Sequence, residues 1–405
     1  MLDIFLSAIF FAVTFFVPQL SLVTMMIFLM PLYKIGNEKK LLKGFIWGLI
    51  VFGVHWSWII MLFKKELLYS TGIVLWILIT IWCSLFSALW IYFFKNHRTI
   101  STILFFVFIK QGILLPLGKL EGLPLLNPLV LLAQYPICLK PLYYISDIGM
   151  FTIIFGLQNW IANKNNILQS FYILLLCLLT LIAQQYLVEK KYIINGATII
   201  TPWWYQQKKG AMFEGYRLAH DIGKQSTATT QIIITPESTF CFDVNEFLHF
   251  ISVWCDSSQN IPILLSAYTV SGGNPHNSLL LLHNNTLVRK YLKKHKMPFM
   301  ERTVWFEYFL KSPILSFDFL SDASVAQFQN DLIGISGKIY QLFVCSEFFW
   351  EVKKIWGYPI LFLWNDIWLS SDYIKKIALL FISYFEQKYH VPVYYAATSG
   401  MKNIC

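Results

Sequence analysis

A cysteine at the end of an apolar run is the first residue that could do chemistry. The stretch QLFVCSEFFW, residues 341–350, indicates a buried β-strand that ends at Cys345 and then turns polar at Ser346 and Glu347. A thiol at such a strand-to-helix turn is placed as a nucleophile, because its sulfur can project into a pocket. Buried cysteine is also common as a small core residue, so this stretch alone leaves both interpretations open.

Two further reactive side chains follow other predicted strands. Glu237 lies just past the apolar run 232–234, and Lys293 comes after the strand-like run 278–282 and a short turn. Together with Cys345 they form a coherent set for acyl transfer. The carboxylate would remove the thiol proton, the ammonium would stabilise thiolate and oxyanion, and the sulfur would attack a carbonyl.

Each of these residues also has a structural interpretation. Glu237 could cap a helix that follows it. Lys293 lies in a cluster with Lys290, Lys294 and Lys296, which could be a solvated or lipid-facing basic strip.

The composition points to a membrane protein with two domains. Of 405 residues, 57% are apolar and 13% are charged, which is too apolar for an ordinary soluble protein. Residues 1–190 carry long apolar runs, whereas residues 195–405 mix short apolar runs with polar residues. The net charge of +10 is spread through loops, which favours anionic lipid over nucleic acid as the partner. The seven cysteines show neither a CxxC pair nor metal-ligand spacing, which argues against a zinc site and a disulfide framework.

The first domain is predicted to hold about seven transmembrane helices. Residues 2–33 predict two short helices that turn at Pro18. Residues 118–142 are interrupted by prolines, which favours a folded or re-entrant loop over a span. A helix needs about 20 residues to cross the hydrocarbon core. The remaining runs of about this length are residues 45–63, 73–94, 100–117, 145–162 and 167–187.

The loops between these helices predict an orientation. If residues 2–33 form a hairpin, the loops at 34–43, 95–98 and 164 share one side of the membrane. They carry more Lys and Arg than the loops on the other side. The richer side is normally cytoplasmic, so the second domain is expected to face away from the cytoplasm.

The second domain is predicted to be a layered α/β domain. Continuous short apolar runs are typical of strands that are buried on both faces, with helices covering the sheets. Functional residues in such folds tend to follow strand ends. The predicted strands are residues 197–200, 231–234, 261–266, 278–282, 342–345, 360–363 and 391–395.

With these flanks, the order Glu, Lys, Cys resembles the carbon–nitrogen hydrolase (nitrilase) superfamily. The apolar spans before them make the chain similar to the bacterial apolipoprotein N-acyltransferases in particular. The matching motifs are Pro236-Glu237, Asn277-Ser278, a Y-x-K-x-H pattern with Tyr291, Lys293, His295, Pro298, Phe299 and Glu301, then Cys345 with Glu347, and Asn365-Asp366 with Trp368. Gly44, Gly48, Gly53 and Trp56 resemble the family's glycine-rich third helix.

The resemblance implies a membrane α-helical bundle of about seven transmembrane helices, followed by an α/β, nitrilase-like αββα sandwich as catalytic domain. It implies an enzyme of the bacterial inner membrane that needs no cofactor and no metal. The enzyme would move a fatty acyl group from a phospholipid to the N-terminal diacylglyceryl-cysteine of an apolipoprotein through a Cys thioester. Its partners would be the phospholipid donor, the apolipoprotein acceptor and membrane lipid, with the catalytic domain in the periplasm.

Residue by residue, the resemblance assigns Glu237 as the base, Lys293 as the group that holds the oxyanion, and Cys345 as the nucleophile. The supporting acids would be Glu301 and Glu347, which orient Lys293 and Glu237 or accept the amine, and a purely structural role for these two acids is equally open. The substrate-binding residues would be Asn277 and Trp368.

The chain also departs from the family pattern. Ser346 replaces the usual tyrosine after the nucleophile, and Met300 replaces the glycine before Glu301. The sequence ends before the family's closing strands and final membrane helix. An uncovered sheet edge is destabilising, so weak or no transferase activity is expected of this 405-residue form.

Two other functions remain open from the sequence. One is a membrane-anchored amidase of the same superfamily, in which water replaces the amine. The other is a degenerate paralogue that binds lipid or protein without turnover.

Overall fold

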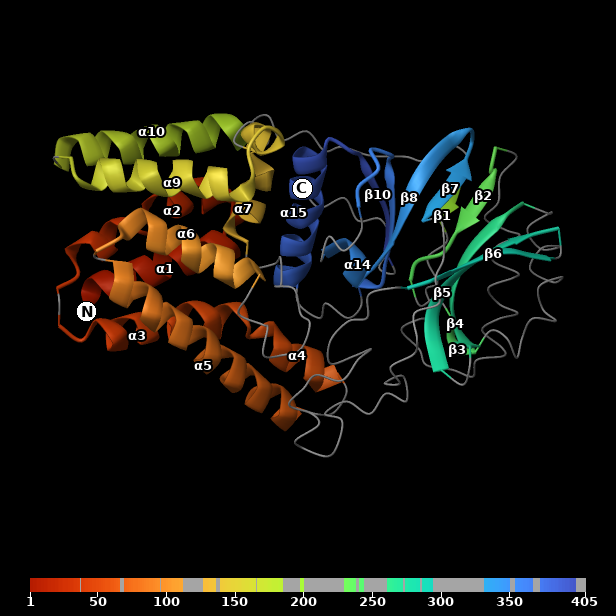
Figure 1. The fold of residues 1–405 in the computed structure, drawn as a ribbon, viewed down its shortest axis with the longest axis horizontal. Helices are drawn as coiled ribbons and strands as arrows, with labels where there is room; N and C mark the ends of the chain where they lie inside the picture. The colour runs from red at the N-terminus through yellow and green to blue at the C-terminus, as the bar shows by residue number, and fades with distance from the viewer. Residues whose placement is uncertain are drawn as a thin grey trace. The chain divides into compact units, whose positions relative to one another are not determined.

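The computed structural model divides the chain into two compact units, the helical unit (Met1–Glu189 with Leu369–His390) and the sheet unit (Lys190–Trp368 with Val391–Asn403) (Figure 1). The structure describes residues 1–36, 38–65, 69–94, 96–111, 127–135, 139–164, 166–184, 197–199, 229–237, 240–243, 261–271, 274–284, 286–293, 331–349, 354–366 and 372–397.

The helical unit follows the predicted order of apolar runs. Its elements are α1 (Leu2–Phe16), η1 (Pro18–Leu20), α2 (Ser21–Ile27), η2 (Met30–Lys34), α3 (Lys40–His55), α4 (Trp58–Lys65), α5 (Tyr69–Phe94), α6 (Arg98–Gln111), α7 (Pro128–Leu131), η5 (Leu132–Gln134), η6 (Lys140–Tyr143), α9 (Asp147–Ala162), α10 (Asn166–Gln184) and α15 (Asp372–Tyr389). The predicted turn at Pro18 is confirmed, because η1 separates α1 from α2.

Two helical stretches among the described residues are long and apolar enough to cross a membrane. They are Lys40–Met61, which joins α3 to α4, and Tyr69–Phe94, which is α5. The other apolar helices are shorter where the structure describes them, including Leu2–Phe16 and Ser21–Lys34. The helical region is therefore confirmed, whereas the count of seven spans stays a prediction.

Helices α3 and α5 pack closely because small residues line their contact. A Cβ atom added at Gly48 would lie 2.5 Å from the Cα atom of Ser84, and one at Gly44 would lie 2.5 Å from the backbone oxygen of Ser87. Only glycine allows two backbones to come this close, which is the usual way for membrane helices to associate. The hydroxyls of Ser84 and Ser87 donate to the carbonyls of Thr80 and Cys83 one turn earlier in α5, so these polar groups are satisfied.

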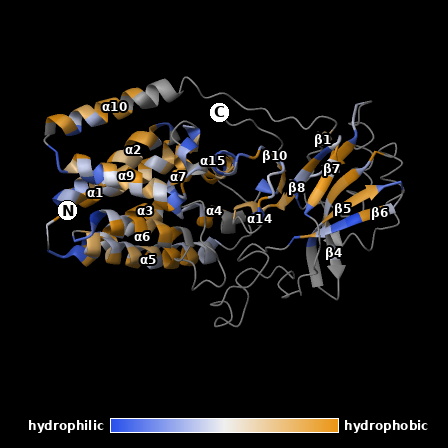
Figure 2. Cartoon of the chain, turned by 45° about the horizontal axis from the view of Figure 1, so that its top comes forward, coloured by the Kyte–Doolittle hydropathy of each residue, from blue (hydrophilic) through white to orange (hydrophobic). Residues whose placement is uncertain are grey.

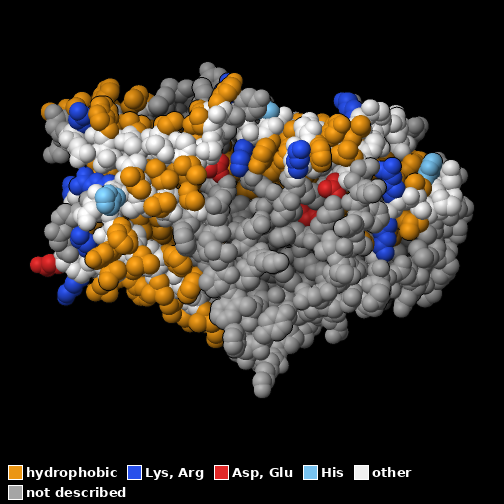
Figure 3. All heavy atoms as spheres, viewed as in Figure 1, with side chains coloured by type: hydrophobic (Ala, Val, Ile, Leu, Met, Phe, Trp, Pro, Cys, Tyr) orange, Lys and Arg blue, Asp and Glu red, His pale blue; other side chains and the backbone are white. Residues whose placement is uncertain are grey.

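The outward face of α5 is apolar instead of polar. From Val74 onward, the exposed side chains of α5 are Val74, Ile77, Leu78, Ile81, Leu85, Leu89, Tyr92 and Phe93. Figure 3 shows hydrophobic side chains over much of the described surface of the helical unit, and Figure 2 shows the same apolar character along its helices. Small residues at a helix–helix contact and large apolar residues on the outward face are typical of helices that pack in lipid.

Three basic loops lie at the same end of the helical unit. The Arg98 guanidinium lies 4.6 Å from the ring centre of Tyr33 and donates to Asn163 Oδ1 at 3.3 Å. These contacts join the loops that follow η2, α5 and α9, as the loop alternation predicts. Lys and Arg side chains gather at the left end of this unit in Figure 3.

The described part of the proline-rich segment is folded into short helical turns. Asn127 caps α7 by accepting from the Leu129 amide at 3.1 Å, and the Ser21 hydroxyl donates to the Leu131 carbonyl at 2.8 Å. Helix α15 packs on α7, η5 and η6. Its Tyr384 hydroxyl donates to Asp147 at 2.7 Å. The structure thus groups α15 with the helical unit, whereas the sequence analysis places it with the catalytic domain.

The sheet unit contains two mixed sheets. The first has the order β1-β2-β4-β5-β6, with β3 paired to β4, and the second has the order β10-β9-β8-β7. The strands are β1 (Ala197–Ile199), β2 (Ile232–Ile234), β3 (Phe240–Asp243), β4 (Ile263–Ser271), β5 (Asn274–His283), β6 (Thr286–Leu292), β7 (Leu332–Ile335), β8 (Lys338–Val344), β9 (Ile360–Trp364) and β10 (Val393–Ala397).

All seven predicted strands are present, with ends that shift by a few residues. In the first sheet β1, β2 and β4 run parallel, while β4, β5 and β6 form an antiparallel meander. In the second sheet β8, β9 and β10 run parallel and β7 is antiparallel to β8. Strands β3, β6 and β7 were not predicted. The mixed α/β class is confirmed, and the αββα layering remains a prediction.

Candidate active site

Glu237 lies in the turn that follows β2, and this turn is fixed to the neighbouring strand β4. The Thr235 amide donates to the Leu264 carbonyl at 3.0 Å, and the Thr235 hydroxyl accepts from the Ser266 amide at 2.9 Å. The Glu237 side chain is buried, with 2% of the residue exposed. The strand end therefore holds a carboxylate inside the protein, where it needs charged or polar partners.

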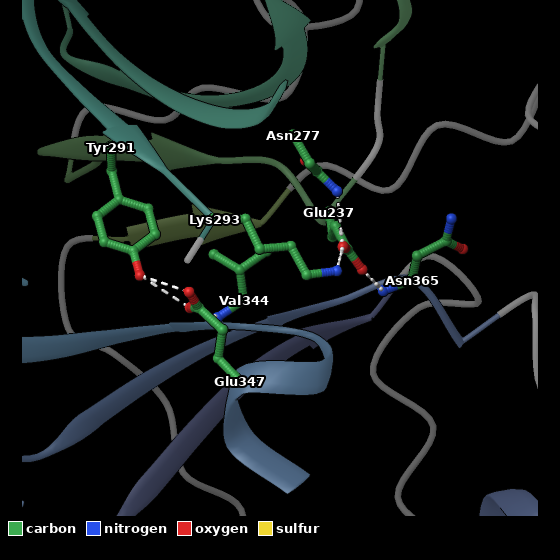
Figure 4. Close-up of polar contacts among 7 residues, drawn as sticks. All are labelled: Glu237, Asn277, Tyr291, Lys293, Val344, Glu347 and Asn365. Carbon is green, nitrogen blue, oxygen red and sulfur yellow. Dashed lines mark hydrogen bonds and ion pairs between the residues drawn. The ribbon is translucent and has the colours of Figure 1, made fainter. Parts of the chain in front are cut away.

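Three groups satisfy this carboxylate, as Figure 4 shows. Glu237 Oε1 accepts from Lys293 Nζ at 2.8 Å and from Asn277 Nδ2 at 2.7 Å. Its Oε2 accepts from the Asn365 amide at 3.2 Å. A carboxylate that accepts from a cation, a side-chain amide and a backbone amide is held in one orientation with its charge compensated.

Lys293 belongs to a buried ion pair and not to a solvated strip. Its side chain and that of Glu237 are 2% and 3% exposed. The Lys293 amide donates to the Asn277 carbonyl at 2.9 Å, which fixes the backbone at this point. The prediction placed Lys293 after a buried strand at 278–282, but an additional strand, β6, comes between them and Lys293 follows its last residue.

Cys345 lies at the turn between β8 and α14 (Ser346–Phe349), as the prediction of a strand-to-helix elbow requires. It is buried and has a positive φ of 44°, in the left-handed region that non-glycine residues rarely adopt. Its amide donates to the Leu363 carbonyl at 2.9 Å, and its carbonyl accepts from the Phe348 amide at 3.1 Å. Strained backbone of this kind is often found at functional sites.

A short path of hydrogen bonds connects the cysteine to the ion pair. Cys345 bonds to Leu363 near the end of β9, and two residues later the Asn365 amide bonds to Glu237. The ends of β2, β8 and β9 and the residue after β6 are thus linked, which places Cys345 in the same region as the Glu237–Lys293 pair.

Glu347 has contacts that the sequence did not predict. Both carboxylate oxygens lie 2.8 Å from the hydroxyl oxygen of Tyr291, and Oε2 also accepts from the Val344 amide at 3.0 Å. Burial, together with the charge of Glu347, raises the pKa of Tyr291 well above 10.0. The hydroxyl therefore keeps its proton and remains a donor at neutral pH.

The other predicted site residues have different outcomes. Asn277 bonds to Glu237, which is a contact that orients the proposed base. Glu301 and Trp368 lie outside the described residues. The backbone amide of Asn365 is a site group that sequence reasoning missed; the only signal for it was the Asn365-Asp366 pair after a strand. Among the described residues, no group of three His, Cys, Asp or Glu side chains is arranged to hold a metal ion.

One comparison with known proteins agrees with the motifs. No family model matches the chain. The chain is distantly similar to apolipoprotein N-acyltransferase. The matching protein is from Campylobacter jejuni and is 24% identical over 192 residues. These residues are 46% of this chain and 41% of that protein, so the match spans less than half of the relative's length. The resemblance stated from the motifs is thereby confirmed as a distant similarity.

A solved structure also matches part of the chain. It is glutamine-dependent NAD+ synthetase from Acinetobacter baumannii in complex with ADP, at 12% identity and a TM-score of 0.25. The match covers 38% of this chain and 30% of that one. A TM-score this low does not establish a shared fold.

Proposed function

We propose that this chain is a membrane-bound acyltransferase that moves a fatty acyl group from a phospholipid to the N-terminal diacylglyceryl-cysteine of an apolipoprotein. The observation that carries the proposal is the buried Glu237–Lys293 pair, linked through the end of β9 to a cysteine in a strained turn. The distant similarity to apolipoprotein N-acyltransferase supports the choice of substrates. The apolar helical unit supports a lipid donor, because lipids leave the bilayer only at a large hydrophobic cost.

In the first half-reaction Glu237 takes the thiol proton of Cys345, and the sulfur attacks the carbonyl carbon of a phospholipid ester. Lys293 stabilises the oxyanion of the tetrahedral intermediate. When the intermediate collapses, the carbon–oxygen bond breaks and the glycerol oxygen takes the proton from Glu237. Lysophospholipid leaves, and the acyl group remains on sulfur as a thioester.

In the second half-reaction the lipoprotein amine attacks the thioester carbon. Glu237 accepts a proton from the nitrogen, the carbon–sulfur bond breaks, and the proton returns to the Cys345 thiolate. The product is an amide, and the enzyme is unchanged. No step in this sequence needs an oxidant, a reductant or a cofactor.

The first prediction is that Cys345→Ala abolishes the covalent intermediate and leaves the protein in the membrane. Purified protein is incubated with a phospholipid that carries a labelled acyl chain, and the labelled peptide is located by mass spectrometry. Cys83→Ala is the matched control, because Cys83 is also a buried free thiol but lies in α5 of the helical unit. Label on Cys345 in the wild type and in Cys83→Ala, with none in Cys345→Ala, is expected.

Other outcomes separate the alternatives. Release of free fatty acid without transfer to a diacylglyceryl-cysteine peptide would identify a hydrolase. Absence of label from the wild type would identify a protein that binds without turnover. Label that persists in Cys345→Ala would show that the nucleophile is wrongly assigned.

A further inference from the structure

Two buried side chains, one near the end of β6 and one just after it, lie on the same face. Tyr291 and Lys293 are two residues apart, so they point to the same side of the strand. Lys293 pairs with Glu237, whereas Tyr291 donates to Glu347. Residues at and just after the end of β6 therefore contact two buried acids, Glu237 and Glu347, although the proposed chemistry uses only the contact with Glu237.

Glu347 connects Tyr291 to the strand that carries the cysteine. It lies in α14, just past Cys345, and its side chain turns back so that Oε2 accepts from the Val344 amide at 3.0 Å. The residue is fully buried. The Glu347 carboxylate thus bonds to the backbone of the residue before Cys345, while the Glu347 backbone lies two residues after Cys345 (Figure 4).

Hydrogen bonds hold the backbone on both sides of Cys345. The Val344 amide is bound by Glu347, the Cys345 amide by the Leu363 carbonyl, and the Cys345 carbonyl by the Phe348 amide. A left-handed conformation at a non-glycine residue persists only when its surroundings enforce it. Of these contacts, the one made by Glu347 is the one that depends on a side chain, and Tyr291 in turn fixes that side chain.

We propose that Tyr291 is a positioning residue for the nucleophile: by holding Glu347, it fixes the turn that directs the sulfur of Cys345. This inference rests on the proposed function, because it takes Cys345 as the nucleophile. Loss of the Tyr291 hydroxyl leaves a buried carboxylate with one donor fewer. The carboxylate then relaxes toward other donors, the Val344 amide is released, and the turn loses its fixed geometry.

The test measures the reactivity of Cys345 without any lipid. The full chain in detergent is treated with iodoacetamide over a range of pH, and alkylation of Cys345 is followed by peptide mass spectrometry. Tyr291→Phe is expected to slow alkylation about tenfold, the size of effect that follows removal of a hydrogen bond to a buried charged group. Its dependence on pH should change as well, because the surroundings of the thiol change.

Two further variants sharpen the test. Glu347→Gln should slow alkylation to a similar degree, and the double variant should be no slower than the slower single variant, since both act through one contact. Tyr340→Phe is the matched control, because it removes a hydroxyl from a buried tyrosine on β8 that lies five residues before the cysteine. It should alkylate at the wild-type rate.

Several results would overturn the inference. They are a wild-type rate and pH profile in Tyr291→Phe, an equal loss in Tyr340→Phe, or strictly additive losses in the double variant. Thermal unfolding is measured for every variant, and if Tyr291→Phe does not fold, a wild-type rate in Glu347→Gln overturns the inference instead. If the wild type forms no thioester with phospholipid while Tyr291→Phe still slows alkylation, the proposed function fails and the positioning role stands.

Discussion

At the scale of single residues, Glu237 and Lys293 depend on each other for their burial. Each is a charge taken out of water, and each is tolerated because the other lies 2.8 Å away. Removal of one partner leaves an uncompensated charge, whereas removal of both leaves none. Stability and chemistry are therefore coupled at this pair.

The second prediction follows from this coupling. Lys293→Met should lower the free energy of unfolding by about 3–5 kcal/mol, because it leaves the Glu237 carboxylate buried without its cation. The double variant Glu237→Gln with Lys293→Met should recover much of this loss, although acyl labelling of Cys345 stays absent. Thermal unfolding in detergent measures the effect. Additive losses in the double variant would show that the two charges do not depend on each other.

The third prediction concerns Tyr291 at alkaline pH. Its folded pKa is raised above 10.0, so the folded chain holds a proton that the unfolded chain loses first. The resulting stability is present below about pH 10 and is lost as the pH rises through the folded pKa, by about 1.4 kcal/mol per pH unit. Tyr291→Phe should therefore lose less stability than the wild type as the pH rises above 10.

Unfolding temperatures of the two proteins over this range provide the measurement. Tyr358→Phe, which removes the hydroxyl of an exposed tyrosine, is measured alongside them. A slope in Tyr291→Phe equal to that of the wild type would show that this hydroxyl is not the group that titrates.

The sequence could nominate the residues of the candidate site but not their contacts. Glu237, Lys293 and Cys345 could be chosen because each lies at or after the end of a predicted strand and in a recognisable motif. The contact of Tyr291 with Glu347 joins residues that are 56 positions apart, and no local pattern specifies such a pairing. It depends on which strand ends meet, which is a property of the sheet topology.

At the scale of elements, the close contact between α3 and α5 explains why α3 contains glycines. The spacing of Gly44 and Gly48 places both on one face of α3, opposite Ser84 and Ser87 of α5. The glycine motif could be read from the sequence, but the small partner residues could not be assigned to it without the packing.

The fourth prediction tests this contact. Gly48→Ala places a methyl group 2.5 Å from the backbone of Ser84, so the two helices must separate. A loss of about 1–3 kcal/mol in stability is expected from overpacking of this kind. Gly156→Ala in α9 is the control, because a Cβ atom there meets nothing within 4 Å. Equal stability of the two variants in a thermal unfolding assay would contradict the close contact.

Strand β6 shows why one element escaped prediction. Its sequence TLVRKYL has neither strict alternation nor a continuous apolar core, and Leu287 and Val288 are exposed. The strand forms because it pairs with β5 across a tight turn, in which Asn284 adopts a positive φ of 48°. Turn chemistry is the signal that could have predicted it.

At the scale of the whole molecule, the basic loops make a prediction about orientation. The contacts of Arg98 with Tyr33 and Asn163 place three Lys- and Arg-bearing loops at one end of the helical unit. We expect that end to be cytoplasmic. The seven spans predicted before the sheet unit are an odd number, so the fifth prediction is that the sheet unit lies in the periplasm. A reporter that works only in the periplasm should then be active when fused after Lys191. Activity of a reporter that works only in the cytoplasm, fused at the same point, would reverse the orientation.

The connection through α15 limits how the molecule can be dissected. This helix joins β9 to β10, which are neighbours in one sheet, yet it belongs to the helical unit, where Tyr384 bonds to Asp147. Any fragment that keeps both strands must also keep α15, and without the helical unit α15 loses its packing on α7, η5 and η6 and the hydrogen bond from Tyr384 to Asp147. No single cleavage of the chain releases the complete sheet without this helix. Proteolytic release of the sheet unit is therefore expected to yield an aggregating product.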